Sequence, residues 1–536
     1  MGTLWYGGKI RTLRRKDETC EALYVENGVI TDIGSFNELR RLYENHISEE
    51  INLKGAVMYP GFVDSHLHMI GHGEKILKLD VSEVTSLAEL KTVLTKAAAS
   101  LPDGEWLLAE GFNENLYEYN TVPDRFVLDE VSTKHPIMVT RVCRHAIVTN
   151  SYGLNLAGVT AESIDPPGGL IEKDESGIPT GYLHDQAQEL VREHIPEKGF
   201  DYIEKALITS LNDLYVKGYT GAHTEDLNYY GDAEKTLQTF KKVIDGSVRK
   251  FRANLLVHHE AAPQILNMRK EIENEFLELG SIKIFADGAL GGRTALLSEP
   301  YTDAADIQGV AIHSPEQLEE LVKEARAYGM PVAIHVIGDL ALEYAIGAIE
   351  AHPVSPGKRD RLIHLQVTRT DLIERLKKLP VVLDIQPRFV ASDFPWVESR
   401  LGEKRLFCSF AWRTLIESGL ICAGGSDAPI EPIDPMLGIH AAVTRRKPGE
   451  KHEGYNAKEK LSLYETLQLF TTGSAKAISK EDDRGVIAPG FKADFTVLDA
   501  DLFDLQPDDW LNVKVVKTVV DNTIMYDEKE TAHSGH

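Results

Sequence analysis

The stretch Met58-Tyr59-Pro60-Gly61-Phe62-Val63-Asp64-Ser65-His66-Leu67-His68 decides how this chain folds. Its apolar residues lead into two histidines that are separated by one residue. Because side chains at positions i and i+2 of a strand point to the same side, His66 and His68 can face one point at the end of a buried strand. Two imidazoles that converge in this way suit a divalent metal ion. A His-x-His pair alone is a weak signal, so its weight depends on what later strands bring opposite it.

The middle of the chain alternates short apolar runs with helical stretches, which indicates βα units around a parallel sheet. Buried parallel strands read as nearly continuous apolar runs. With the opening stretch, seven such runs make eight strands, the count of a closed (β/α)8 barrel. The seven runs are residues 219–223, 253–258, 281–286, 331–335, 361–365, 381–386 and 420–425.

The two ends of the chain differ from this middle. Residues 1–57 and 480–536 are rich in short β-prone pieces and turns, such as Asn27-Gly28 and Asp521-Asn522, and we expect them to build one small sheet domain together. Residues 58–479 then form the barrel domain. Within it, residues 70–212 are far too many for one βα connection, so we interpret them as an insertion or lid at the barrel mouth. The alternative is that this segment supplies barrel strands, which would shift the strand count.

Metal ligands in a barrel should lie at the carboxyl ends of the strands, because that face carries the chemistry. The predicted strands end in, or contain near their ends, a common set of residue types: His66, His68, Lys283, His335, His364 and Asp427. Each has an ordinary alternative. His335 alone is better explained as a core histidine with its hydrogen bonds satisfied, and Asp427 as a helix N-cap. Together, the six predict a metal site.

Lys283 is the hardest of the six to explain structurally. It stands inside the apolar run Ile282–Ala286, and lysine is almost never fully buried without a partner. A neutral, desolvated lysine can react with CO₂ to give a carbamate, an anion able to bridge two cations. The alternative is a lysine that extends its amine to the barrel mouth.

Composition bounds the remaining possibilities. The chain has 536 residues, which favours two or more domains, and its formal charge of −25 argues against binding to a phosphate backbone. The sequence has four scattered cysteines and no Cys-x-x-Cys motif, which indicates reduced thiols. They are Cys20, Cys143, Cys408 and Cys422. The N-terminus lacks the pattern of a secretory signal, and no apolar run reaches the length of a membrane span. We therefore expect a cytoplasmic protein with a small-molecule substrate and neither nucleic acid nor membrane as a partner; a homodimer is the oligomeric state to test.

These residues carry a family resemblance that covers nearly the whole chain. Pro60–His68, Ile282–Gly291, Ala333-Ile334-His335, Ile363-His364 and Gly425–Pro429 resemble the first, fourth, fifth, sixth and eighth strand ends of the amidohydrolase superfamily, and more closely of its YtcJ-like branch, which includes N-substituted formamide deformylases. Gly485–Asp494 resembles that family's re-entry into its small sheet domain. Arg144-His145 with Val148–Ser151 resembles a motif of this branch.

The resemblance implies a distorted (β/α)8 TIM barrel with a composite β-sandwich, and a metal-dependent hydrolase. It implies that His66, His68, carboxylated Lys283 and Asp427 hold one divalent ion, expected to be zinc, and that His335, His364 and the bridging Lys283 hold a second; one ion or two per chain are both found in the superfamily. The expected reaction is hydrolysis of a C–N bond in an amide of the N-substituted formamide or N-acyl amine type, with Asp427 as general base and then acid.

Three further residues are predicted to contact substrate: His145, Arg293 and Gln386. Loop solvation or capping explains each of them about as well. Two alternatives to amide hydrolysis stay open. One is a deaminase of a heterocycle or guanidino group that uses a single metal ion, and the other is a metal-binding regulatory protein without turnover.

Overall fold

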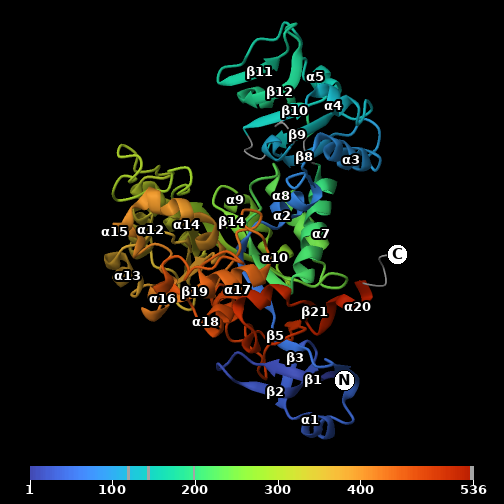
Figure 1. The fold of residues 1–536 in the computed structure, drawn as a ribbon. Helices are drawn as coiled ribbons and strands as arrows, with labels where there is room; N and C mark the ends of the chain where they lie inside the picture. Colours follow the sequence, from blue (N-terminus) through green and yellow to red (C-terminus); the bar gives the residue numbers. More distant parts are fainter. Residues whose placement is uncertain (118–120, 142–144, 197–198, 532–536) are drawn as a thin grey trace. The chain divides into compact units, whose positions relative to one another are not determined.

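The computed structural model describes residues 1–117, 121–141, 145–196 and 199–531 (Figure 1). Cys143 and Arg144 therefore lie outside the described residues. The chain forms two compact units, residues 1–72 with 203–536 and residues 73–202. None of the described helices combines the length and the apolarity that a bilayer crossing requires.

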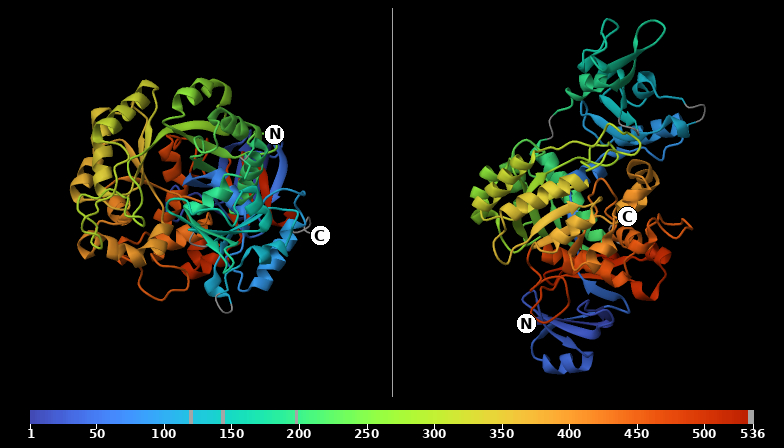
Figure 2. Two further views of the ribbon diagram at one scale, coloured as in Figure 1. Left: turned by 90° about the horizontal axis from the view of Figure 1, so that it is seen from above. Right: turned by 90° about the vertical axis from the view of Figure 1, so that its left-hand side faces the viewer.

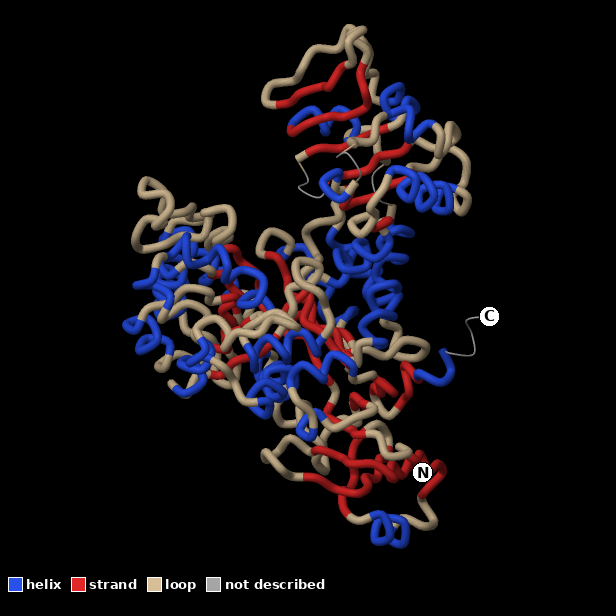
Figure 3. The backbone as a smooth tube through the Cα atoms, viewed as in Figure 1, coloured by secondary structure: helices blue, strands red, loops and turns tan. Residues whose placement is uncertain are grey.

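Eight parallel strands form the centre of the first unit, and all eight coincide with the runs predicted from sequence. They follow one another in chain order around a nearly closed barrel. The red strands of Figure 3 and the left view of Figure 2 show them enclosed by helices. The strands are β6 (Phe62–Leu67), β13 (Tyr219–Thr224), β14 (Arg252–His258), β15 (Leu277–Phe285), β16 (Val332–Val336), β17 (Asp360–His364), β18 (Val381–Ile385) and β19 (Ile421–Gly424).

Amphipathic helices cover this barrel because each buries an apolar stripe on the strands. Helix α11 illustrates how their ends are set: Ser314 and Gln317 form a reciprocal capping box at its start. The helices that connect barrel strands are α7 (Phe200–Val216), α8 (Ala233–Val243), α9 (Ala262–Ile265), η4 (Leu266–Met268), α10 (Arg269–Ile272), α11 (Pro315–Ala327), α12 (Asp339–Ala351), α13 (Thr370–Leu376), α14 (Arg388–Leu401), α15 (Glu403–Leu406) and α16 (Trp412–Glu417). After β19 come α17 (Pro435–Thr444), η5 (Ala457–Glu459), α18 (Leu463–Gln468), η6 (Leu469–Gly473) and α19 (Ser474–Ala477).

The two ends of the chain share one eight-stranded sheet. Its order is β22-β21-β20-β5-β1-β2-β3, with β4 beside β1, and β5 pairs antiparallel with β20. The predicted turns at Asn27-Gly28 and Asp521-Asn522 are confirmed, since all four residues have positive φ. The elements are β1 (Gly2–Arg11), β2 (Thr19–Glu26), β3 (Val29–Gly34), α1 (Phe36–Leu42), β4 (Ile47–Asn52), β5 (Val57–Pro60), β20 (Phe495–Leu498), η7 (Leu502–Asp504), η8 (Pro507–Asn512), β21 (Val515–Val520), β22 (Thr523–Asp527) and α20 (Glu528–Thr531).

The opening stretch of the sequence belongs to both sheets. It was expected to form a single strand, but β5 lies in the terminal sheet and β6 in the barrel, with Gly61 between them. A Cβ on Gly61 would lie 2.2 Å from Oγ1 of Thr220, so the chain can pass from one sheet to the other only with glycine here. The division of the sheets therefore falls at residue 61.

The second unit has a sheet of its own, of order β11-β12-β10-β9-β8-β7. The described strands of residues 70–212 therefore add nothing to the barrel, and the alternative in which they do is wrong. Apolar clusters lie on both faces of this sheet. The unit contains most of α2 (Met69–Leu77), then β7 (Leu79–Asp80), α3 (Leu87–Ala98), β8 (Leu107–Phe112), η1 (Glu114–Leu116), α4 (Arg125–Asp129), β9 (Ile137–Arg141), β10 (Ala146–Thr149), α5 (Ser151–Leu156), β11 (Gly169–Lys173), β12 (Pro179–Asp185), η3 (Gln186–Gln188) and α6 (Glu189–Arg192). Its role as a lid stays a prediction.

Candidate metal centre

The carboxyl ends of the barrel strands surround a cavity of about 380 Å³. All six residues predicted as metal ligands line it, although they come from five different strands or the loops that follow them: His66, His68, Lys283, His335, His364 and Asp427. These side chains were selected because each lies at or near the end of a predicted strand. The fold brings them to one cavity although they lie up to 361 positions apart in the sequence.

His66, His68 and Asp427 form the tightest group. One ligand atom from each lies within 4.8 Å of the other two, and all three are largely buried. Oδ1 of Asp427 is 3.6 Å from Nε2 of His66 and 3.5 Å from Nε2 of His68. Two imidazole nitrogens and a carboxylate oxygen that converge at this spacing match the ligand set of a divalent transition metal ion.

Lys283 completes one side of this group. Its side chain is fully buried, and Nζ is 3.3 Å from Nε2 of His66. Burial lowers the pKa of Lys283 to about 8, against the opposing effect of the carboxylates of Glu225 and Asp427. The neutral amine is therefore a minority form at pH 7 and predominates above pH 8. Because the side chain is fully buried, the lysine does not extend to solvent as its alternative explanation required.

His335 and His364 lie together on the next two strands, with their ring centroids 4.5 Å apart. His364 also contacts His66, at a centroid distance of 5.6 Å. The four imidazoles and the lysine therefore form one continuous cluster around the cavity.

The hydrogen bonds around the imidazoles test whether a metal ion fits. Nδ1 of His68 lies 2.6 Å from the carbonyl oxygen of Glu225, Nδ1 of His364 lies 2.7 Å from Oε1 of Gln386, and Nε2 of His335 lies 3.0 Å from the carbonyl oxygen of Gly288. Each acceptor takes the ring N–H, which leaves the second nitrogen of that ring with a free lone pair. This is how protein environments orient histidine ligands.

His66 is the exception among the four histidines. Its Nδ1 is buried without a hydrogen-bond partner in the described part of the chain, and its Nε2 faces an amine and a carboxylate. The amine of Lys283 can donate a hydrogen bond to this Nε2, and a divalent ion that took Nε2 as a ligand would replace that hydrogen bond. The donor set therefore fits a bound divalent ion.

Protonation states agree with this fit for three of the four histidines and for Asp427, but not for His68. Burial opposes ionisation of His68, but its hydrogen bond with Asp427 and the nearby carboxylates raise its pKa to about 9, so a metal ion bound there would displace a proton. Burial lowers the pKa of His66 and of His335 well below the ordinary value, and it lowers the pKa of His364 to about 4. Burial opposes ionisation of Asp427, but its hydrogen bond with His68 and the neighbouring cationic groups keep the pKa of Asp427 below its usual value. Neutral imidazoles and an ionised carboxylate are the forms that bind metal ions.

Local backbone structure brings Asp427 to His66 and His68. In the described residues β19 and β6 share no strand pairing, and a second carboxylate joins them instead: Asp64 accepts hydrogen bonds from the backbone N–H groups of Ser426 and His66. The N–H of Asp427 donates to the carbonyl oxygen of His66 at 2.8 Å. A Cβ on Gly425 would lie 2.6 Å from the nitrogen of His66, so this close approach requires glycine.

Backbone strain also concentrates here. His364 and Asp427 adopt φ of +83° and +58°, a region that costs roughly 1–3 kcal/mol for a residue with a side chain. Such conformations persist where the surroundings hold them, and both residues reach the cavity from them.

The three predicted substrate contacts have other partners. Gln386 is buried behind His364, whose Nδ1–H it accepts, and Arg293 forms a two-bond ion pair with Asp303. Neither belongs to the described residues that line the cavity. His145 is an exposed residue of the second unit, with its Nδ1 3.0 Å from Asp185. Substrate contact by these three residues stays a prediction.

Sequence reasoning missed Glu225, which follows β13. Its side chain is fully buried near Lys283 and accepts a hydrogen bond from the hydroxyl of Tyr229, whose ring packs edge-on against His68. The predicted strand stopped at His223, one residue before the end of β13 and two residues before Glu225. Had it been extended, the acidic pair Glu225-Asp226 at its end would have been found by the rule that found the other residues.

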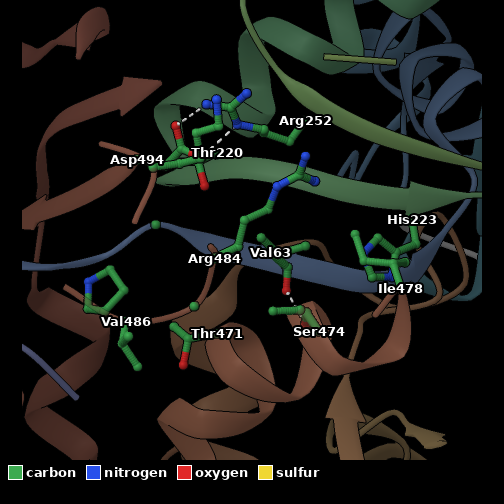
Figure 4. Close-up of a pocket in the computed structure, with 15 residues that line it drawn as sticks. Val63, Thr220, His223, Arg252, Thr471, Ser474, Ile478, Arg484, Val486 and Asp494 are labelled. Carbon is green, nitrogen blue, oxygen red and sulfur yellow. Dashed lines mark hydrogen bonds and ion pairs between the residues drawn. The ribbon is translucent and has the colours of Figure 1, made fainter. Parts of the chain in front are cut away.

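A second cavity lies at the opposite, amino-terminal end of the barrel strands (Figure 4). It has a volume of about 30 Å³, which is room for one water molecule. Arg252 at the start of β14 pairs with Asp494 of the terminal sheet there, at 2.7 and 3.0 Å. This ion pair joins the barrel to the terminal sheet, and the cavity beside it has no room for a substrate.

Comparison with known proteins identifies the family of this chain. The model of the amidohydrolase family matches residues 49–526. The chain belongs to the amidohydrolase family. Among similar amidohydrolases, "Putative amidohydrolase YtcJ" of Bacillus subtilis is 47% identical over 98% of this chain and 100% of its own length. N-substituted formamide deformylase of Arthrobacter pascens is 26% identical over 97% of both chains.

A solved structure with a similar fold also belongs to a metal-dependent hydrolase. An "uncharacterized metal-dependent hydrolase" from Pyrococcus furiosus superposes with a TM-score of 0.77 at 28% identity, over 95% of this chain and 100% of that one. The protein is thus a hydrolase of the metal-dependent amidohydrolase superfamily, with a His66, His68 and Asp427 group suited to a metal ion.

Proposed function

We propose that this protein hydrolyses the C–N bond of an amide of the N-substituted formamide or N-acyl amine type. One observation carries the proposal: Asp427 reaches the cavity beside His66 and His68, so a proton-accepting carboxylate lies within 3.6 Å of both imidazoles. The similarity to N-substituted formamide deformylase over 97% of the chain supports this choice of bond.

The ligand set that we propose follows from the contacts. His66, His68, Asp427 and a carboxylated Lys283 hold one divalent ion, and His335 and His364 share that lysine to hold a second, with zinc as the expected element. A bound divalent ion supplies an acidified water and a Lewis acid for the amide carbonyl. Carboxylation of Lys283 would turn a buried amine 3.3 Å from His66 into an anion, and an anion, unlike the protonated amine, can serve as a ligand to a cation.

The protein's own residues perform the proton transfers in this proposal. Asp427 is kept ionised by its neighbours, so it can accept a proton at Oδ1 and deliver it to the nitrogen of the leaving amine. Gln386 and the carbonyl oxygens of Glu225 and Gly288 hold the imidazoles in one tautomer. Phe285 and Ile337 supply apolar side chains to the lining of the cavity.

The test is a substrate screen on protein whose metal content has been measured by elemental analysis. We expect one to two equivalents of transition metal per chain and release of amine from N-formyl or N-acyl amines. Release of ammonia from aminated heterocycles in the same screen, without amide cleavage, would show a deaminase instead. Metal-loaded protein that turns over neither class would favour the regulatory alternative, and a metal content near zero would contradict the site itself.

A further inference from the structure

Part of the wall of the cavity beside the metal cluster is made by α14, the helix that follows β18. Phe389, Asp393 and Trp396 of this helix line the cavity at positions i, i+4 and i+7, which is one helical face. Phe389 lies next to His364, with ring centroids 6.4 Å apart, and Trp396 approaches Gly291. Asp393 therefore lies one turn, or about 6 Å, further along the helix than the residue beside the metal cluster.

Asp393 is a carboxylate among apolar neighbours. The only hydrogen bond shown for it in the described chain is a long one, 3.5 Å, from the hydroxyl of Ser392. No described lysine, arginine or histidine forms an ion pair with it. The nearby carboxylate of Glu431 is already paired with Arg388 at 3.0 Å, so the arginine is engaged elsewhere.

The surroundings leave this carboxylate in need of a donor. Burial and the neighbouring Glu431 raise the pKa of Asp393 to about 7. Asp393 is half-buried, and an unpaired carboxylate beside apolar residues costs more than a paired one. The side chains of Leu290 and Ile430 carry no donor, and in the described residues neither Trp396 nor Gln366, which also line the cavity, donates a hydrogen bond to Asp393.

We propose that Asp393 is a specificity residue that binds a cationic nitrogen, an ammonium or guanidinium group, at the far end of the substrate's amine portion, with an apolar or aromatic spacer packed between Phe389 and Trp396. This inference rests on the proposed function, because it assigns the metal cluster to the scissile amide and α14 to the amine portion. It thereby narrows the substrate class to amides of diamines or of related cationic amines.

A matched pair of substrates tests this inference. N-formyl-4-(aminomethyl)benzylamine carries an ammonium group at the far end of its ring, and N-formyl-4-ethylbenzylamine has an ethyl group of similar size there. A charge-assisted hydrogen bond in a partly buried site predicts that the wild type prefers the ammonium compound in kcat/KM by roughly tenfold to a hundredfold. Asp393→Asn should bring this ratio close to one.

The control variant is Glu398→Gln, an exposed position on the same helix outside the cavity, which should keep the wild-type ratio. Equal use of both substrates by the wild type, or an unchanged ratio in Asp393→Asn, would overturn the inference. Thermal melting and metal content of each variant show whether it is folded and loaded.

A binding measurement separates this inference from the proposed function. Calorimetry on the metal-loaded protein compares 1,4-bis(aminomethyl)benzene with 4-ethylbenzylamine, with no turnover required. Tighter binding of the diamine that is lost in Asp393→Asn supports the inference even if no amide is cleaved. Amide cleavage without any preference, in rate or in binding, leaves the proposed function standing and removes the role of Asp393.

Discussion

The two ends of the barrel both bury charged side chains, but they do so in opposite ways. At the amino-terminal end two arginines have carboxylate partners: Arg252 pairs with Asp494, and Arg484 with Glu278 at 2.9 Å. At the carboxyl end, an amine and four imidazoles gather around Asp427, with the buried carboxylate of Glu225 nearby, and Lys283 lies 3.3 Å from His66. The cavity at the amino-terminal end has a volume of about 30 Å³, and the cavity at the carboxyl end has a volume of about 380 Å³.

This difference shows how to tell a structural cluster from a functional one. The ion pairs around the small cavity join the barrel to the terminal sheet. Around the large cavity, ligand atoms converge on one point, the backbone is strained at two of the residues and there is space beside them, so this cluster requires something from outside the chain. Substitutions at the carboxyl end should therefore lower activity more than stability. Substitutions at the amino-terminal end should lower stability more than activity.

The largest effect is expected from Asp427→Asn. The amide keeps the size of the side chain but cannot accept the proton, so kcat on a cleaved amide should fall by about a thousandfold or more. The melting temperature should stay within a few degrees of the wild type, because the backbone hydrogen bonds of residue 427 are retained. Kinetics and thermal melting of the same preparation check both, and a variant with wild-type kcat would remove Asp427 from the chemistry.

Removal of the metal should have the next largest effect. Dialysis against a chelator should lower activity by at least about a hundredfold, and Zn²⁺ should restore it. If the ion was bound at 100 to 1,000 times its dissociation constant, the free energy of unfolding should fall by about 3–4 kcal/mol. Circular dichroism should show that the barrel remains folded. Full activity in protein shown by elemental analysis to be metal-free would contradict the metal site.

The pH dependence of reloading tests the state of Lys283. The lowered pKa means that the neutral amine predominates above pH 8, whereas an ordinary lysine becomes neutral only above about pH 10.5. At a fixed concentration of dissolved CO₂, the rate at which CO₂ and Zn²⁺ reactivate metal-free protein should therefore rise about tenfold per pH unit up to pH 8 and then level off. Carbon-13 NMR with labelled bicarbonate should show a carbamate signal in the wild type and none in Lys283→Met. A rate that keeps rising towards pH 10, or a signal that survives the substitution, would count against carboxylation of this lysine.

Sequence alone located all eight barrel strands, because buried parallel strands have an unambiguous apolar pattern and their ends can be inspected one by one. It also brought six donors to one cavity, since strands of a barrel share one carboxyl edge. It did not separate β5 from β6 at Gly61, because the reason is a contact with Thr220 that lies 159 positions away. Nor did it give the roles of Gln386, which orients His364, or of Asp393, since both depend on which way a side chain points after its strand has ended.

The smallest effect on activity, and a large one on stability, is expected from Asp494→Asn at the amino-terminal end. The variant removes the carboxylate that pairs most closely with the buried guanidinium of Arg252. Breaking a buried pair costs about 3–5 kcal/mol, and because Asp521 remains 3.8 Å from this guanidinium we expect a loss of about 3 kcal/mol of unfolding free energy. Because Asp494 also accepts a hydrogen bond from the N–H of Asp521, the loss should loosen the terminal sheet from the barrel. In the folded fraction, kcat should change by less than about twofold, since none of these residues lines the large cavity. Chemical denaturation and kinetics at low denaturant measure the two quantities. A fall in kcat with unchanged stability would mean that the two ends of the barrel do not divide their tasks between structure and chemistry.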